Sequence, residues 1–184
     1  MKRIVGISGS LRAASFNTAL VRIAGARLAE YGTFELADLR LPLFDEDLEA
    51  QGMPEAVTRL IEQIAAADGV LISTPEYNKN ISGVLKNALD WLSRTRPQPL
   101  NNKPVAIMSA AAGRAGGERS QYSLRHCLTP FNPLIVQLPE MMLAAPASTI
   151  QDGELTDEMA IKLLDRLLTQ FKRLIAAQET MNVA

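Results

Sequence analysis

The stretch Gly69-Val70-Leu71-Ile72-Ser73-Thr74-Pro75-Glu76-Tyr77-Asn78 decides the fold of this chain. Its first five residues form an apolar run typical of a buried strand, and Pro75 and Asn78 then set a turn. The segment from Gly83 to Trp91 follows with the spacing of a helix. A loop between a buried strand and a helix lies at the carboxyl edge of a parallel sheet, where open α/β sheets bind their ligands.

The same alternation of apolar runs and helix-like segments continues along the whole chain. It predicts strands over 4–7, 34–39, 69–73, 104–109 and 134–137, and helices over 17–31, 54–67, 82–92, about 118–128 and 157–178. Residues 41–47 predict a loop, because a proline and an acidic cluster interrupt the periodicity. Five strands that alternate with five helices indicate one α/β domain over residues 1–184, with a parallel sheet covered on both faces.

Composition narrows the functional classes. The chain has 184 residues, a net charge of −1, 47% hydrophobic and 21% charged residues, which is typical of a globular protein in water. This small net charge does not indicate a basic surface that binds nucleic acid. No apolar run approaches the roughly 20 residues that span a bilayer, so we expect no membrane association. The lone cysteine, Cys127, excludes an intrachain disulfide and is compatible with a reducing cytoplasm, where we expect the protein to work.

The loop after the first strand, Gly9 to Asn17, has the residues of a phosphate cradle. Gly9 allows a sharp turn and a close approach to a ligand. Ser10, Ser15 and Asn17 offer hydroxyl and amide donors, and Arg12 offers a cationic fork suited to phosphate oxygens. The start of the following helix favours an anion at the same place. Ser15 or Asn17 could instead simply cap that helix, and the two roles are compatible.

The loop after the third strand has the residues to border a flat ring. Tyr77 can offer an aromatic face, and the backbone of residues 76–78 is exposed by the turn. The alternative is that Tyr77 packs against the protein and Glu76 is a solvated charge. A phosphate cradle and a ring-binding loop at one sheet edge together indicate flavin mononucleotide (FMN).

A third loop, Ser109 to Gly117, consists mainly of small residues and follows the fourth strand. Its glycines and alanines leave room for a ligand against the backbone, whose N–H groups could bond the carbonyl edge of a ring. Arg114 could meet a phosphate of a nicotinamide nucleotide, or it could be an exposed, solvated arginine. Both interpretations of Arg114 stay open.

These motifs, in this order, resemble the NADPH-dependent FMN reductases, a family that includes bacterial quinone and chromate reductases. The resemblance covers nearly the whole chain. It rests on Gly9-Ser10-Leu11-Arg12 with Ser15 and Asn17, on Thr74 to Asn78, on Leu85-Lys86-Asn87-Ala88 with Asp90-Trp91, and on Gln121-Tyr122 with Leu124-Arg125. It implies a flavodoxin-like three-layer sandwich with a five-stranded parallel sheet in the order 2-1-3-4-5.

The resemblance also implies a set of cofactor-binding residues. Phosphate ligands would be Ser10, Arg12, Ser15 and Asn17, next to Phe16; the isoalloxazine ring would be bordered by Pro75, Glu76, Tyr77 and Asn78, and on its other edge by Ser109, Gly113 and Gly116. Two departures from the family pattern bear on substrate access. Many relatives carry proline where this chain has Ser82, and the run Ala110 to Ala112 has less distinctive side chains than the same segment of many relatives.

Relatives are dimers or tetramers, so we expect a homodimer or homotetramer. Arg119, Tyr122 and Glu140 match positions that can link subunits, or they are ordinary polar surface residues.

The implied reaction passes two electrons from NADPH or NADH through the flavin to a quinone or a related acceptor such as free flavin, an azo compound or chromate, by a ping-pong mechanism. The flavin supplies the redox chemistry, so no side chain is assigned as catalytic. His126 is the only histidine, which excludes a histidine-based metal cluster, and no Gly-x-Ser-x-Gly motif of a hydrolase is present. We expect no metal. The alternatives are a flavodoxin-like electron carrier, against which the weak net charge argues, and a flavin-binding sensor without turnover.

Overall fold

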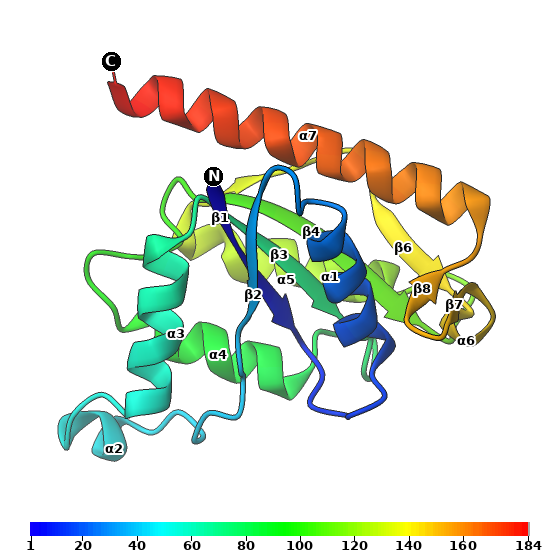
Figure 1. The fold of residues 1–184 in the computed structure, drawn as a ribbon. Coiled ribbons are helices and arrows are strands. Elements are labelled where there is room, and N and C mark those ends of the chain that lie inside the picture. The colour runs from blue at the N-terminus through cyan, green and yellow to red at the C-terminus, as the bar shows by residue number, and fades with distance from the viewer. Residues whose placement is uncertain (184) are drawn as a thin grey trace.

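The computed structural model describes the backbone of residues 1–183 and the side chains of residues 1–180, and its centre is one parallel sheet (Figure 1). The strands are ordered β2-β1-β3-β4-β5, as predicted, and β6 also pairs with β4. The strands are β1 (Lys2–Ser8), β2 (Gly32–Leu36), β3 (Gly69–Thr74), β4 (Pro104–Ala111), β5 (Leu134–Ile135) and β6 (Met141–Ala144). The helices are α1 (Phe16–Ala26), α2 (Glu46–Ala50), α3 (Glu55–Ala66), α4 (Gly83–Ser93), α5 (Glu118–Leu128), α6 (Pro146–Thr149) and α7 (Glu158–Val183), with a 3-10 turn at Thr129–Phe131. A small antiparallel hairpin, β7 (Ile150–Gln151) and β8 (Glu154–Leu155), precedes α7.

Helices cover both faces of the sheet, because successive side chains of its central strands alternate between two apolar cores. Ile4 of β1 and Leu71 of β3 pack on the core that α1 and α7 cover. Val5 and Val70, one residue away in each strand, pack on the core under α3, α4 and α5. Figure 1 shows α7 as a long helix across the top of the sheet, with α3 and α4 at the opposite side. The predicted three-layer sandwich is therefore confirmed.

The fifth place in the sheet differs from the predicted single strand over 134–137. Only Leu134 and Ile135 pair with β4 as strand β5, opposite Pro104 and Val105. Pairing with β4 resumes at β6, where Met141 lies opposite Met108. Five residues, 136–140, thus lie between these two pairings, whereas β4 has only two residues, 106 and 107, over the same stretch. This surplus forces the segment out of the sheet, and its Pro139 has no N–H group for a ladder.

Other boundaries move by a few residues for local reasons. β2 begins at Gly32 rather than Phe34, because Gly32 and Thr33 already pair with Lys2 and Arg3. The first helix ends at Ala26, and turns follow it up to Tyr31. The predicted loop over 41–47 runs into α2, whose N-cap is Asp45; its carboxylate accepts the N–H of Asp47 at 2.8 Å. The acidic cluster thus favours a helix start.

The sheet brings the three predicted loops to one edge. Ser8 at the end of β1 pairs with Ser73 of β3, and Thr74 pairs with Ser109 of β4. The N–H of Gly9 still donates to the carbonyl of Ser73 at 2.8 Å, so the first loop begins against β3. No helix within residues 1–183 has both the length and the apolar character needed to cross a bilayer.

Candidate functional site

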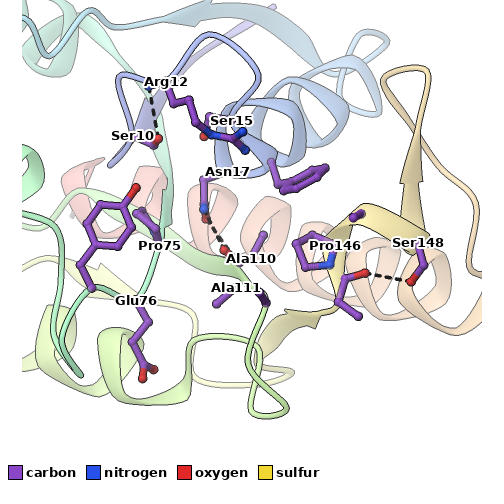
Figure 2. Close-up of a pocket in the computed structure, with 15 residues that line it drawn as sticks. Ser10, Arg12, Ser15, Asn17, Pro75, Glu76, Ala110, Ala111, Pro146 and Ser148 are labelled. Carbon is purple, nitrogen blue, oxygen red and sulfur yellow. Dashed lines mark hydrogen bonds between the residues drawn. The ribbon is translucent and has the colours of Figure 1, made fainter.

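A cavity of about 520 Å³ lies at this carboxyl edge, within the size range of small-molecule and cofactor sites (Figure 2). Four chain segments surround it. They contribute Ser10, Arg12, Ser15, Phe16 and Asn17 from the first loop, Pro75, Glu76 and Tyr77 from the second, Ala110, Ala111 and Ala112 from the third, and Ala145, Pro146, Ala147 and Ser148 from the segment after β6. The structure thus brings together eight of the twelve residues predicted to bind the cofactor. Asn78, Ser109, Gly113 and Gly116 do not line the cavity.

The start of α1 forms the polar end of the cavity. The hydroxyl oxygen of Ser15 accepts the N–H of Thr18 at 3.3 Å, so Ser15 is the predicted N-cap. Within the described residues, the N–H groups of Phe16 and Asn17 donate to no other protein group. The Arg12 guanidinium lies 5.5 Å above the centre of the Phe16 ring and has no carboxylate within 4.0 Å in the described part of the chain. Unpaired donors and an unpaired cation at a helix start make an anion site.

Asn17 lies at the cavity wall, but its side chain is committed to the fold. Its amide nitrogen donates to the carbonyl of Ala110 at 2.8 Å, and its oxygen accepts from Ala110 N at 3.0 Å and from the Ser73 hydroxyl at 2.8 Å. Figure 2 shows this link from α1 to the end of β4. Because both acceptor positions of the oxygen are used, one amide hydrogen is what Asn17 retains for a ligand.

Ser82 joins the first loop to the helix that follows the second. Its hydroxyl oxygen accepts the N–H of Leu85 at 3.2 Å as the N-cap of α4, and the same hydroxyl donates to the carbonyl of Gly9 at 2.5 Å. A Cβ added at Gly9 would lie 3.1 Å from both the Ser82 and the Thr74 hydroxyl oxygens, which is why glycine suits this point. A proline at position 82 could make neither bond.

The second loop is a tight turn that presents its first residues to the cavity. Asn78 and Lys79 have φ angles of 51° and 65°, and Tyr77 and Asn80 exchange two backbone hydrogen bonds of 3.0 Å, as in a type I′ turn. Asn78 therefore occupies the turn itself, while Pro75, Glu76 and Tyr77 line the cavity. Tyr77 is 53% exposed, so its ring stands at the opening rather than in the core.

Glu76 is not a free solvated charge. Its carboxylate accepts the backbone N–H of Arg119 at 3.1 Å, in the first turn of α5, and also pairs with the Arg119 guanidinium at 3.4 Å. A carboxylate at a helix N-terminus is stabilised by the helix dipole. This bond fixes the second loop against α5, and Glu76 also lines the cavity.

The third loop supports the cavity from behind. The Ser109 side chain is fully buried; its hydroxyl donates to the carbonyl of Gly116 at 2.7 Å and accepts from Gln121 Nε2 at 2.9 Å. Gly116 has a φ of +60°, and a Cβ there would lie 2.7 Å from the carbonyl carbon of Met142. Ser109 and Gly116 thus hold β6 in place, whereas Gly113 faces open space. Arg114 and His126 are both exposed, and neither lines the cavity.

The fourth wall, Ala145 to Ser148, was missed from the sequence. Ala145 has a φ of 44°, Pro146 begins α6, and the N–H and hydroxyl of Ser148 donate to the carbonyl of Ala145 at 3.0 and 2.9 Å (Figure 2). The signal that could have revealed it is the short apolar run at 141–143 followed by small residues and a proline. This repeats the pattern of an apolar strand and a small-residue loop seen at 105–112.

The cavity's chemistry fits FMN. Arg12 and the free N–H groups at the start of α1 suit a phosphate. The alanine-rich walls suit an uncharged ring. Within the described residues no group of three or more His, Cys, Asp or Glu side chains is placed to hold a metal ion. The acidic cluster instead caps α2, and its Glu49 pairs with Arg94 at 2.9 Å.

Comparison with known proteins agrees with this arrangement. The family model of the NADPH-dependent FMN reductases matches residues 2–147. An NAD(P)H-dependent FMN reductase of Pseudomonas aeruginosa is 44% identical over 168 residues, covering 90% of this chain and 91% of the relative. A quinone reductase of Escherichia coli K12 is 41% identical over 180 residues, covering 94% of this chain and 95% of the relative.

Among solved structures, the flavoenzyme NAD(P)H:(acceptor) oxidoreductase FerB of Paracoccus denitrificans superimposes with a TM-score of 0.88 at 31% identity, covering 97% of this chain and 99% of that one. A family match over most of the chain, relatives above 40% identity and the geometry of the cavity lead to one conclusion. The chain belongs to the NADPH-dependent FMN reductase family.

Proposed function

We propose that this protein is an oxidoreductase that carries two electrons from NADPH or NADH to a quinone or a related acceptor, with FMN bound in the cavity at the carboxyl edge of the sheet. The observation that carries this proposal is that the loop after β1 and the loop after β3 line the same cavity, one with a cation and free N–H donors and the other with a turn beside an exposed aromatic ring. The family supports the same reaction.

At the phosphate end, Ser10 and Arg12 bind the FMN phosphate together with the N–H groups that open α1. Ser10 N donates to the Ser8 hydroxyl at 3.3 Å, and Ser15 N donates to the carbonyl of Arg12 at 3.1 Å. These internal bonds hold the loop in shape before the ligand arrives, which lowers the entropy cost of binding.

At the ring end, Pro75, Glu76 and Tyr77 border one side of the isoalloxazine, and Ala110 to Ala112 border the other. FMN held there by these residues would supply the redox chemistry, which is hydride acceptance from the reduced nicotinamide and delivery of two electrons to the acceptor. The protein orients the ring and stabilises negative charge on it through backbone N–H groups. The wall from Ala145 to Ser148 keeps water from that side of the cavity.

We propose that donor and acceptor use the same side of the ring, beside the exposed Tyr77, so that the oxidised nicotinamide leaves before a quinone takes its place. This arrangement supports ping-pong kinetics. Quinones and free flavin are the acceptors that the relatives compared above support, since one is named a quinone reductase and the other an FMN reductase.

We further expect a homodimer or homotetramer in the cytoplasm. Tyr77 and Tyr122 are 53% and 52% exposed. Arg119 is tied to Glu76 at the cavity, which places α5 at the edge of the site. Large exposed aromatic side chains are enriched where subunits meet. Sedimentation of the FMN-loaded protein would give the oligomeric state.

An anaerobic titration tests the proposal. Purified, FMN-loaded protein is mixed with NADPH, and the flavin absorbance is followed. We expect rapid bleaching that a quinone reverses. Flavin that binds but stays oxidised would identify an electron carrier or a sensor, and failure to bind flavin would reject the proposal. Steady-state consumption of NADPH in the presence of quinone further separates an enzyme from a carrier.

A further inference from the structure

A second cavity, of about 240 Å³, adjoins the first, and the reaction proposed above assigns no role to it. It lies between the first loop, α1 and the segment that follows β2. Ser10 and Arg12 line both cavities, so the two are neighbours at the same sheet edge. Its other lining residues include Arg22, Asp38 and Arg40.

The second cavity has an excess of positive charge. Three arginines and one acidic residue, Asp38, line it, whereas the whole chain has a net charge of −1. Asp38 is already paired, since its carboxylate accepts from the Arg40 guanidinium at 3.1 Å and from Arg40 N at 3.0 Å. Arg12 and Arg22 have no carboxylate within 4.0 Å among the described residues. With Arg12 assigned to the FMN phosphate and Arg40 paired with Asp38, Arg22 is the lining cation left uncommitted in the described part of the chain, and it would attract an anion there.

The arginines are placed around one space by three different elements. Arg22 stands one helical turn beyond Thr18 on the same face of α1, and both line the cavity. Arg40 reaches back from the segment after β2 and donates to the carbonyl of Leu11 at 3.5 Å. The hydroxyl groups of Ser8 and Thr18, 2.8 Å apart, complete a polar wall. Guanidinium forks and hydroxyl groups are the donors that bind phosphate oxygens.

We infer that this second cavity binds a phosphate monoester, and that in the working enzyme this group is the 2′-phosphate of NADPH. The inference rests on the proposed function. The FMN phosphate has its own donors at the start of α1, so Arg22 is left without a partner, while the Arg40 guanidinium contacts only Asp38 and the carbonyl of Leu11 among the described residues. NADPH is the electron donor that carries a phosphate monoester, and NADH lacks that group. The second cavity would therefore set the preference for NADPH over NADH.

Binding measurements on FMN-loaded protein test the inference without requiring turnover. The probes are adenosine 2′,5′-bisphosphate, AMP and inorganic phosphate, each titrated by calorimetry at fixed ionic strength. We expect the bisphosphate to bind about tenfold or more tightly than AMP, as one set of charge-assisted hydrogen bonds provides. Equal affinity for the bisphosphate and AMP, whose own phosphate is also a monoester, would show that the cavity does not select the 2′-phosphate and would overturn the assignment to NADPH. Inorganic phosphate that binds as tightly as the bisphosphate would overturn the assignment to NADPH.

Two variants and a control locate the site. Arg22→Gln and Arg40→Gln are expected to abolish most of the preference for the bisphosphate and to raise the KM for NADPH about tenfold, with a much smaller effect on NADH. Arg27→Gln is the control, because Arg27 lies just past the end of α1 and pairs with Asp165 at 2.6 Å, outside both cavities. It should retain the preference. Arg22→Gln could instead lower the affinity for FMN as much as it lowers the affinity for the bisphosphate. That result would show that the second cavity is part of the FMN site, and it would overturn the inference.

The outcome also separates this inference from the proposed function. A protein that binds the bisphosphate through Arg22 and Arg40 but does not pass electrons from NADPH would support the anion site and reject the reaction. A protein that oxidises NADPH and NADH equally well, with no effect of Arg22→Gln, would support the reaction and reject the anion site.

Discussion

The hydroxyl group of Ser82 donates a hydrogen bond to the carbonyl oxygen of Gly9, with 2.5 Å between the two oxygen atoms. Ser82 is 1% exposed and also caps α4. One side chain therefore links the loop proposed to bind the FMN phosphate to the helix that follows the ring-binding loop. The two halves of the cavity are held in register by this bond.

Replacing Ser82 should weaken FMN binding through the phosphate alone. In Ser82→Ala the first loop loses one hydrogen bond, worth about 1 kcal/mol, so we expect the Kd for FMN to rise about fivefold. Riboflavin, which lacks the phosphate, should bind as before. Fluorescence titrations with both ligands give the ratio. The control is Ser82→Gly, which keeps most of the cap but loses the Gly9 bond, and it should show the same ratio. A parallel loss of riboflavin affinity would show that Ser82 acts on the fold as a whole.

Arg12→Ala should lower FMN affinity by about 10- to 100-fold, because a hydrogen bond to a charged group contributes roughly 1.5–3 kcal/mol. Arg12 is exposed and pairs with no carboxylate in the described residues, so the free energy of unfolding of the apoprotein should change by less than about 0.5 kcal/mol. Arg12→Lys, which retains the charge but not the fork, should lie between the two. Unchanged FMN affinity in Arg12→Ala would reject the phosphate cradle.

Asn17→Ala should behave in the opposite way and destabilise the fold. The change leaves the Ser73 hydroxyl and both backbone groups of Ala110 without their partners in a buried place. We expect the free energy of unfolding of the apoprotein to fall by about 3 kcal/mol, measured by urea denaturation. A loss below about 1 kcal/mol would mean that water replaces the side chain, and the role of Asn17 in linking α1 to β4 would have to be abandoned.

Gly116 and Gly113 provide a matched pair within one loop. Gly116→Ala places a Cβ 2.7 Å from the Met142 carbonyl carbon at a φ of +60°, so β6 must shift and stability should fall by about 1–3 kcal/mol. Gly113→Ala meets open space and should change stability by less than about 1 kcal/mol. Thermal unfolding measures both. Since β6 leads into the wall at Ala145, the KM for quinone should change in Gly116→Ala alone.

Tyr31 should give the protein a loss of stability at alkaline pH. Burial, and after it the negative charge of Asp68, raises the pKa of Tyr31 above its ordinary value of 10.0. As the pH rises past about 10, the unfolded state releases this proton before the folded state does, so stability is lost up to the folded pKa. Tyr31→Phe lacks this loss. The difference in unfolding free energy between the two proteins should therefore move in favour of Tyr31→Phe between about pH 9 and pH 11. A constant difference would contradict the shift.

The sheet and the place of the site could be predicted because they depend on local pattern. Apolar runs such as Val70 to Ser73 and Val105 to Ile107 indicate buried strands, and the order along the sheet, implied by the family, is confirmed. The break at 136–140 could not be predicted, because it depends on how many residues the neighbouring strand uses over the same distance. Strand length is a property of the pair and not of either segment.

The same distinction applies to the site. Arg12 and Pro75 reach the cavity because they lie in loops directly after strands, which the sequence reveals. The role of Asn17 depends on Ala110, which is 93 positions away, and that of Ser82 depends on Gly9, 73 positions away. No local pattern encodes such bonds. Asn78, Ser109 and Gly116 were expected beside the ring, but the structure uses them to shape the loops that surround the cavity.

The division of the sheet edge into β5 and β6 has a consequence for how this enzyme can change over evolutionary time. The phosphate cradle and the ring-binding loop emerge from β1 and β3, which are buried on both faces and tolerate little variation. The wall from Ala145 to Ser148 emerges from a short edge strand beside a segment already free of the ladder. Insertions and substitutions there can reshape the entrance for a new acceptor, while the loops after β1 and β3 that are proposed to bind the cofactor stay unchanged.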